Sequence, residues 1–205
     1  MSEKWSKMPD EGAVKTTFDA IKRNGINAIL AENGKEALAH IKRIIPRGAE
    51  VMSGSSVTLE EIGFKAYLKS GKHDWKDLYA EIQMEKDDSV RQELRRKSVT
   101  AEYYLGSVNA ITLKGELVAC DMSGSRIGAY LYAAKHLMLV SGANKITSNL
   151  EDAMRRVQEH AFPLTNQMVK KAYGFSCDMA KWVIINRETI ENRTTLILVK
   201  EKLGF

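Results

Sequence analysis

The chain has 205 residues, of which 44% are hydrophobic and 28% charged, and this composition excludes a disordered or fibrous protein. A chain of this length can bury a large core, and we expect one domain over residues 1–205. Its formal charge of +5, from 31 basic and 26 acidic side chains, is mild for a protein that binds nucleic acid, so no nucleic-acid partner is predicted.

The first half of the chain alternates between helical and extended apolar patterns. The spacing predicts a helix over residues 12–22 that stops at Asn24-Gly25, a strand over 26–31 and a second helix that ends at Pro46. A strand over 49–52 follows and leads into a glycine-serine turn. The sequence from Thr58 to Glu61 has the Thr-x-x-Glu form of a capping box, so a helix capped by Thr58 is predicted just after the glycine turn.

The second half continues the alternation with one exception. Residues 65–97 are highly charged, and their pattern predicts several helical pieces, with Asp74 as the cap of the one that contains Leu78 and Ile82. Residues 101–105 show no clear period. The runs 108–113 and 116–120 predict a hairpin around Lys114-Gly115. The remaining pattern predicts a helix over 126–134, a strand over 137–140, a helix capped by Ser148 or Asn149 and closed by Pro163, and strands over 182–185 and 194–199.

Strands that alternate with helices of ten to fifteen residues indicate the α/β class. We expect a three-layer α/β/α arrangement around a mixed, mostly parallel sheet, with the hairpin supplying its antiparallel part. The longest apolar run, Ala129 to Val140, contains Lys135 and His136 and falls short of the roughly 20 residues that cross a membrane, so no membrane span is predicted.

The two cysteines, Cys120 and Cys177, have no Cys-x-x-Cys or Cys-x-x-His spacing. This disfavours a disulfide framework, a structural zinc site and an iron–sulfur cluster held by this chain alone. The four histidines lie in different predicted elements, so no metal site is expected. The first residues have no apolar segment of the kind found in signal peptides, and we therefore expect a cytoplasmic location.

A basic cluster in the charged stretch is intermixed with acids. Its members are Arg91, Arg95, Arg96 and Lys97, beside Glu85, Asp87, Asp88 and Glu93. Mixed signs at helical spacing support a helix through i,i+4 pairs and create no field of one sign. We interpret this segment as a solvated helix face.

Three predicted strands end in a turn of small residues followed by a polar side chain. The turns are Ser53-Gly54-Ser55-Ser56, Asp121-Met122-Ser123-Gly124-Ser125-Arg126 and Ser141-Gly142-Ala143-Asn144-Lys145. In open α/β sheets ligands bind at the carboxyl ends of the strands, where helix N-termini present unpaired N–H groups. We therefore predict a site there for a small anionic ligand such as a nucleotide, CoA or phosphate. Alternatively, glycine and serine merely permit the bends.

Within these turns, three side chains are candidates for catalysis. Asp121 could act as a base, or could only cap a turn or helix. Arg126 and Lys145 could neutralise an anion, although Lys145 could also face solvent. Cys120, within a strand pattern, is interpreted as a core residue, and no Gly-x-Ser-x-Gly elbow supports a serine hydrolase.

Four segments together resemble the lactate-utilisation (LUD) domain family. They are GSSVTLEEIG (Gly54 to Gly63), ITLKGELVACDMSGSR (Ile111 to Arg126), LMLVSGANKITSNLEDAMRRV (Leu137 to Val157) and LILVKEKLGF (Leu196 to Phe205). The chain resembles a short, stand-alone member, with the resemblance running over most of its length. The resemblance implies the fold of CoA transferases, ribose-5-phosphate isomerase and glucosamine-6-phosphate deaminase. It also implies a bacterial or archaeal origin and a role beside iron–sulfur partners that oxidise L-lactate to pyruvate.

This chain departs from the family pattern in its cysteines. Where many short relatives have a cysteine cluster, it keeps only Cys177, so electron transfer would need cysteines from another chain. The family has no agreed catalytic residues, and the resemblance supports positions such as Ser55 and Asn144 without assigning them roles.

Three functional hypotheses remain open. The chain could be a non-redox, ligand-binding accessory subunit of lactate or related organic-acid metabolism, alone or as a homo-oligomer. It could instead be an independent enzyme acting on a phosphorylated, CoA-linked or carboxylated small molecule. In the third hypothesis it is an interaction module with purely structural turns.

Overall fold

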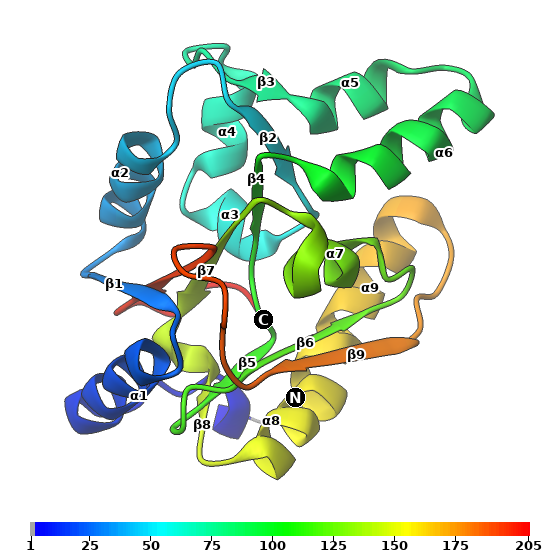
Figure 1. Ribbon diagram of the computed structural model, residues 1–205. Helices are drawn as coiled ribbons and strands as arrows, with labels where there is room; N and C mark the ends of the chain where they lie inside the picture. Colours follow the sequence, from blue (N-terminus) through cyan, green and yellow to red (C-terminus); the bar gives the residue numbers. More distant parts are fainter. Residues whose placement is uncertain (1–2) are drawn as a thin grey trace.

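The computed structural model describes residues 3–205 and centres on a six-stranded parallel sheet (Figure 1). The strand order is β1-β10-β7-β4-β2-β3. These strands are β1 (Asn27–Ala31), β2 (Glu50–Ser53), β3 (Lys76–Asp77), β4 (Tyr103–Gly106), β7 (His136–Gly142) and β10 (Thr194–Val199). The central β7 and β10 are almost entirely buried, which explains their continuous apolar sequences, because a parallel sheet is covered on both faces.

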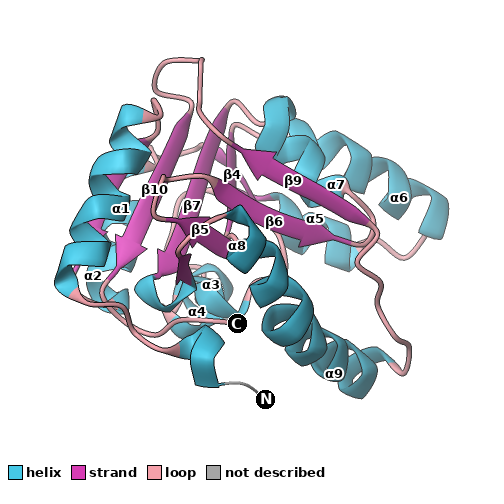
Figure 2. Ribbon diagram, turned by 90° about the horizontal axis from the view of Figure 1, so that it is seen from below, coloured by secondary structure: helices cyan, strands magenta, loops and turns pink. Residues whose placement is uncertain are grey.

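Helices cover both faces of this sheet (Figure 2). One face packs against α2 (Gly34–Ile44), α3 (Val57–Glu61) and α4 (Phe64–Lys69) through a cluster that includes Ile41 and Phe64. The other face packs against α1 (Glu11–Arg23), α5 (Leu78–Met84) and α7 (Ser125–Gly128). The α/β class and the three-layer arrangement are therefore confirmed.

The predicted hairpin forms, but in a second sheet. The order of this sheet is β8-β5-β6-β9, with β5 (Ala110–Thr112), β6 (Leu117–Asp121), β8 (Ile146–Thr147) and β9 (Lys181–Ile185). Antiparallel pairs join β5 to β6 and β6 to β9, so the antiparallel strands that we expected inside one mixed sheet lie outside the parallel one. The reason is packing: Ile111 and Leu117 of the hairpin join the core beneath the main sheet instead of extending its edge.

The two predicted helix caps at Thr58 and Asp74 were wrong. Ser56 caps α3 by accepting from the Leu59 N–H, which leaves the Thr58 hydroxyl free for another contact. Asp77, rather than Asp74, caps α5, because residues 76 and 77 pair with β2 and keep the chain extended. Asp74 instead forms a surface ion pair with Arg47 at 2.8 Å.

Pro163 does not close a helix as predicted. Asn149 caps α8 (Leu150–Arg156), a π-helical turn (Val157–Ala161) follows, and α9 (Phe162–Tyr173) continues with the proline in its first turn. Proline has no N–H to donate and its ring crowds the preceding turn, and here that preceding turn is the wider π-helical one.

The charged outer segment is helical in pieces, as expected. None of the residues of α6 (Asp88–Lys97) is buried, and two of its arginines pair with acids of the same helix: Arg91 with Asp88, and Arg96 with Glu93 at 3.9 Å. The solvated-face interpretation is confirmed. Within residues 3–205, the structure has no helix with both the length and the apolar character needed to cross a membrane.

Candidate functional site

The carboxyl ends of β2, β4 and β7 lie next to one another at one edge of the parallel sheet. Ser53 ends β2, Gly106 ends β4 with Ser107 directly after it, and Gly142 ends β7. Two of the three predicted turns, Ser53 to Ser56 and Ser141 to Lys145, therefore share this edge. Ser55 is exposed, whereas Ser53 and Ser56 are buried.

The third predicted turn belongs to the second sheet, contrary to the expectation of a shared edge. It follows β6, where the Asp121 carboxylate accepts from the Arg126 N–H at 3.2 Å. The Ser123 and Ser125 hydroxyls lie 3.1 Å apart on the exposed side, next to Gly124 in a left-handed conformation (φ +89°). Only Arg126 reaches the main edge, where a Cβ built at Gly54 would lie 3.5 Å from its Cδ.

Lys145 is the most unusual side chain at this edge. Although it is only 3% exposed, it donates to the Thr58 hydroxyl at 2.9 Å, the Ser107 hydroxyl at 3.0 Å and the Val108 carbonyl at 3.1 Å. Burial lowers the pKa of Lys145 well below its ordinary value. The nearby Arg156 lowers it further, whereas Glu61 acts in the opposite direction. None of its three acceptors carries a negative charge.

A chain of polar contacts joins Lys145 to Arg126. The Tyr130 hydroxyl donates to the Ser107 carbonyl at 2.9 Å and accepts from the Ser107 N–H at 3.0 Å. The Arg126 guanidinium lies 5.9 Å from the centre of the Tyr130 ring and donates to the Cys120 carbonyl. Burial raises the pKa of Tyr130, so its phenol stays neutral and keeps its proton.

The C-terminal residues cover the site, and Figure 2 shows the C-terminus beside α3 and α4. The Leu203 N–H donates to the Asn144 amide oxygen at 3.0 Å, and the Gly204 N–H donates to the Glu61 carboxylate at 2.6 Å. A Cβ at Gly204 would lie 3.1 Å from the Lys145 Nζ, and a Cβ at Gly142 would lie 2.6 Å from the Leu203 nitrogen. Glycine at both positions lets this segment close over Lys145.

A second lysine, Lys65, was not predicted from the sequence. It donates to the Ser53 hydroxyl at 2.7 Å, and its Nζ lies 4.4 Å from the centre of the Tyr79 ring. Burial lowers the pKa of Lys65 to about 8, partly opposed by Asp77.

The free energy of unfolding should therefore rise between pH 8 and 9.5. In that interval the unfolded chain keeps the Lys65 proton, whose pKa is then about 10.4, while the folded protein releases it. Urea unfolding at pH 7.5 and 9.5 measures the change in the free energy of unfolding. Both pH values lie below the ordinary tyrosine pKa of about 10. The Lys65→Met variant should show a smaller rise than the wild type, and an identical rise in both proteins would contradict the assignment.

Sequence reasoning missed Thr58, Lys65, Ser107 and Tyr130 as members of the site. Ser107 follows Gly106 in the same kind of small-residue turn as the others, but the strand before it had no periodicity to reveal it. Lys65 lies among many similar lysines, and its sequence spacing does not distinguish it.

The thiols lack the features of reactive cysteines. Burial raises the pKa of Cys120, which lies in β6, and also raises the pKa of Cys177, whose N–H donates to Asn166. Reactive cysteines have a lowered pKa. Among residues 3–205, no group of three histidine, cysteine, aspartate or glutamate side chains is placed to hold a metal ion.

Comparison with known proteins agrees with the fold. The LUD domain model matches residues 14–199, so the chain belongs to the LUD domain family. A solved structure of a DUF162 family protein from Deinococcus radiodurans aligns with a TM-score of 0.57 and 10% identity, over 94% of this chain and 99% of that one. No curated protein matches. The resemblance found in the sequence is thereby confirmed.

Proposed function

We propose that this LUD-domain chain binds a small anionic metabolite at the sheet edge formed by β2, β4 and β7. The observation that supports it most is Lys145, a buried amine whose three acceptors are neutral. Arg126 and Arg156 both lie within electrostatic range of it. Burial without a counter-charge disfavours the ammonium form of Lys145, and an anion at this edge would supply the interaction that this form lacks.

An anion can approach this site from the side of Arg126. Arg126 is partly exposed and lies against Gly54, which has no side chain to obstruct a ligand. Contact with Lys145 itself requires Leu203 and Gly204 to move, since they cover it. Binding and displacement of the C-terminal residues should therefore occur together.

The family name suggests a place in lactate or related organic-acid utilisation, and we propose an accessory, non-redox role there. The raised pKa values of the two free thiols of this chain support assigning the electron transfer to iron–sulfur partners. Recovery of an iron–sulfur protein in a pull-down with the intact chain would support this role.

An independent enzyme is the second candidate, and the state of Lys145 favours it. A lysine whose pKa is lowered by burial is more often neutral, which is the form that acts as a base or nucleophile. Asp121, for which the sequence left open a role as a base or as a cap, accepts from the Arg126 N–H of α7 and lies in the other sheet. Lys145 is therefore the better candidate for a base acting on a phosphorylated, CoA-linked or carboxylated substrate.

Thermal unfolding with lactate, CoA, ATP and sugar phosphates tests the binding proposal. A ligand at a hundred times its Kd stabilises the folded state by about 2.7 kcal/mol, which for this chain length raises Tm by roughly 5–10 °C. The Lys145→Met and Arg126→Met proteins should lose most of this shift. Lys15→Met, which removes an exposed partner of Asp19, should keep it. If no ligand shifts the wild type, or Lys145→Met retains the full shift, the proposal is wrong.

A further inference from the structure

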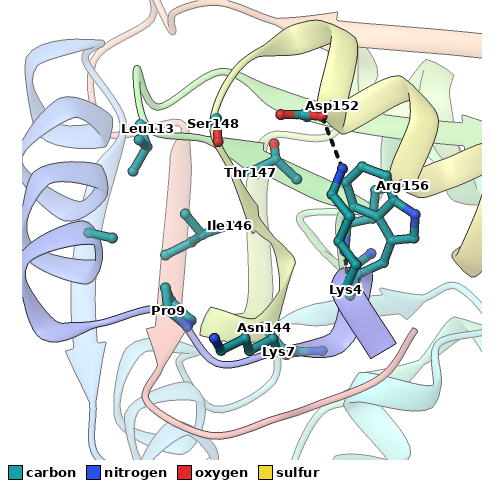
Figure 3. A pocket seen from close by; sticks show the side chains of 12 residues that line it. Lys4, Lys7, Pro9, Leu113, Asn144, Ile146, Thr147, Ser148, Asp152 and Arg156 are labelled. Carbon is teal, nitrogen blue, oxygen red and sulfur yellow. Dashed lines mark hydrogen bonds and ion pairs between the residues drawn. The ribbon is translucent and has the colours of Figure 1, made fainter. Parts of the chain in front are cut away.

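A cavity of about 200 Å³ lies between the N-terminal segment and α8 (Figure 3). The 3₁₀ turn Glu3–Ser6 and residues of α1, β8 and α8 line it. Leu113, Ile146 and Pro9 form an apolar wall, and Lys4, Asp152 and Arg156 lie on the opposite side.

Asn144, which lines this cavity, has one unpaired donor in its amide group. Asn144 is 2% exposed and lines the cavity, and its oxygen accepts from the Leu203 N–H. This bond fixes the orientation of the amide, because a flipped group would place its NH₂ against that N–H. The amide nitrogen has no hydrogen-bond partner within residues 3–205.

The guanidinium of Arg156 contributes a second unpaired donor. Arg156 is completely buried, with Nε donating to the Trp5 carbonyl at 3.0 Å and Nη1 donating to the Asn109 carbonyl. Its third nitrogen, Nη2, has no partner in the described part of the chain. Buried donors are almost always paired, so two unpaired ones on residues that line a single cavity point to an acceptor that binds between them.

The charge around the cavity favours an anion. Lys4, Lys7 and Arg156 supply three positive charges, and the carboxylate of Asp152, 3.8 Å from Lys4, is the negative charge among the lining residues. The apolar wall opposite is suited to a short hydrocarbon chain. A ligand with an oxyanion at one end and an apolar body at the other would satisfy both walls.

We propose that this cavity is a second binding site, for the carboxylate of a small organic acid with a short apolar body. Arg156 and Asn144 donate to the carboxylate oxygens, Lys7 adds charge at the rim, and Ile146 and Leu113 contact the body of the acid. This site is separate from the Lys145 edge, although Asn144 lies between the two sites, with its oxygen towards the C-terminal residues and its nitrogen available to the cavity.

Butyrate is a suitable probe, and neutral butyramide is its matched control. In ¹H–¹⁵N spectra of the intact protein, the Trp5 indole and Lys7 amide signals should shift saturably with butyrate. Butyramide should bind at least tenfold more weakly, since hydrogen bonds to a charged acceptor are stronger than hydrogen bonds to a neutral one. Inorganic phosphate, which lacks an apolar body, should also bind more weakly than butyrate.

Asn144→Asp tests the site without changing its shape. The substitution keeps the acceptor for Leu203 but replaces the unpaired donor with a negative charge, so the butyrate shift should disappear. Lys7→Met, at the rim, should weaken binding severalfold without touching the Lys145 edge. Asn33→Asp makes the same chemical change at the cap of α2, where either side chain accepts from the Glu36 backbone N–H, and this variant should bind butyrate normally.

Three outcomes would overturn this second site while leaving the Lys145 proposal intact. One is the absence of a saturable butyrate shift at Trp5 and Lys7. Another is equal binding of butyrate and butyramide, and the third is unchanged binding in both Asn144→Asp and Lys7→Met. Conversely, a normal butyrate shift in Lys145→Met, together with loss of the ligand-induced rise in Tm, would show that the two sites are independent.

Discussion

Replacing Arg193 with methionine is expected to lower the free energy of unfolding by about 3–5 kcal/mol. The side chains of Arg193 and Glu188 are only 4% and 9% exposed, and their ion pair measures 2.8 Å. Removing the arginine leaves a carboxylate in the interior with only hydroxyl and backbone donors. The loss of one partner of a buried pair costs far more than the loss of a surface pair.

Arg193 also fixes the chain segment that contains Tyr130. Its guanidinium donates to the carbonyls of Ala129, Tyr130 and Ala134, so it holds the π-helical turn Ala129–Ala133 against the start of β10. The substitution would leave these carbonyls unpaired and release the segment that positions Tyr130 against Ser107. We therefore expect weaker ligand binding as well as a lower Tm.

Urea unfolding of Arg193→Met beside Arg47→Met measures this effect. Arg47 forms an ion pair of the same length with Asp74, but its side chain is 88% exposed, so its loss should have little effect. Equal stability losses in the two variants would contradict the role assigned to the buried pair.

Gly106→Ala is the second substitution with a large expected effect. Gly106 ends β4, between β7 and β2, and an added Cβ would overlap the Tyr130 hydroxyl and lie 2.8 Å from its Cζ. Tyr130 cannot easily move aside, because its hydroxyl is bonded to both backbone groups of Ser107. Overpacking of a rigid core should cost about 3 kcal/mol, or roughly 6–12 °C in Tm.

Gly128→Ala is the matched control for this substitution. No atom lies within 4 Å of a Cβ built at Gly128, and the residue is helical, so alanine should be neutral or slightly stabilising. Thermal unfolding of both proteins decides the matter. A Tm for Gly106→Ala within 2 °C of the wild type, by the same scaling of Tm with stability, would show that Tyr130 is free to move.

The sequence was sufficient to predict those strands that are buried on both faces. Leu137 to Val140 and Thr194 to Val199 are continuous apolar or β-branched runs, and both lie at the centre of the sheet. β4 could not be predicted in this way, because its four residues, Tyr103–Gly106, show no period. Its place between β7 and β2 depends on pairing with distant strands.

The site was predictable only where its residues follow a recognisable strand. Gly142 and Lys145 lie at the expected edge for this reason, and Arg126 reaches it from another sheet. The burial of Lys145 depends on contacts with distant parts of the chain. Ser107 lies 38 positions before it and Thr58 lies 87 positions before it. Sequence spacing carries no information about contacts over such separations.

A crystal structure with the ligand that most raises Tm tests the proposed anion site most directly. The expected result is an anionic group within hydrogen-bond distance of the Arg126 guanidinium and the Lys145 Nζ, with Leu203 and Gly204 displaced from the edge. The contradicting result is a ligand bound elsewhere, with the C-terminal segment unmoved and Lys145 still donating to Thr58, Ser107 and Val108.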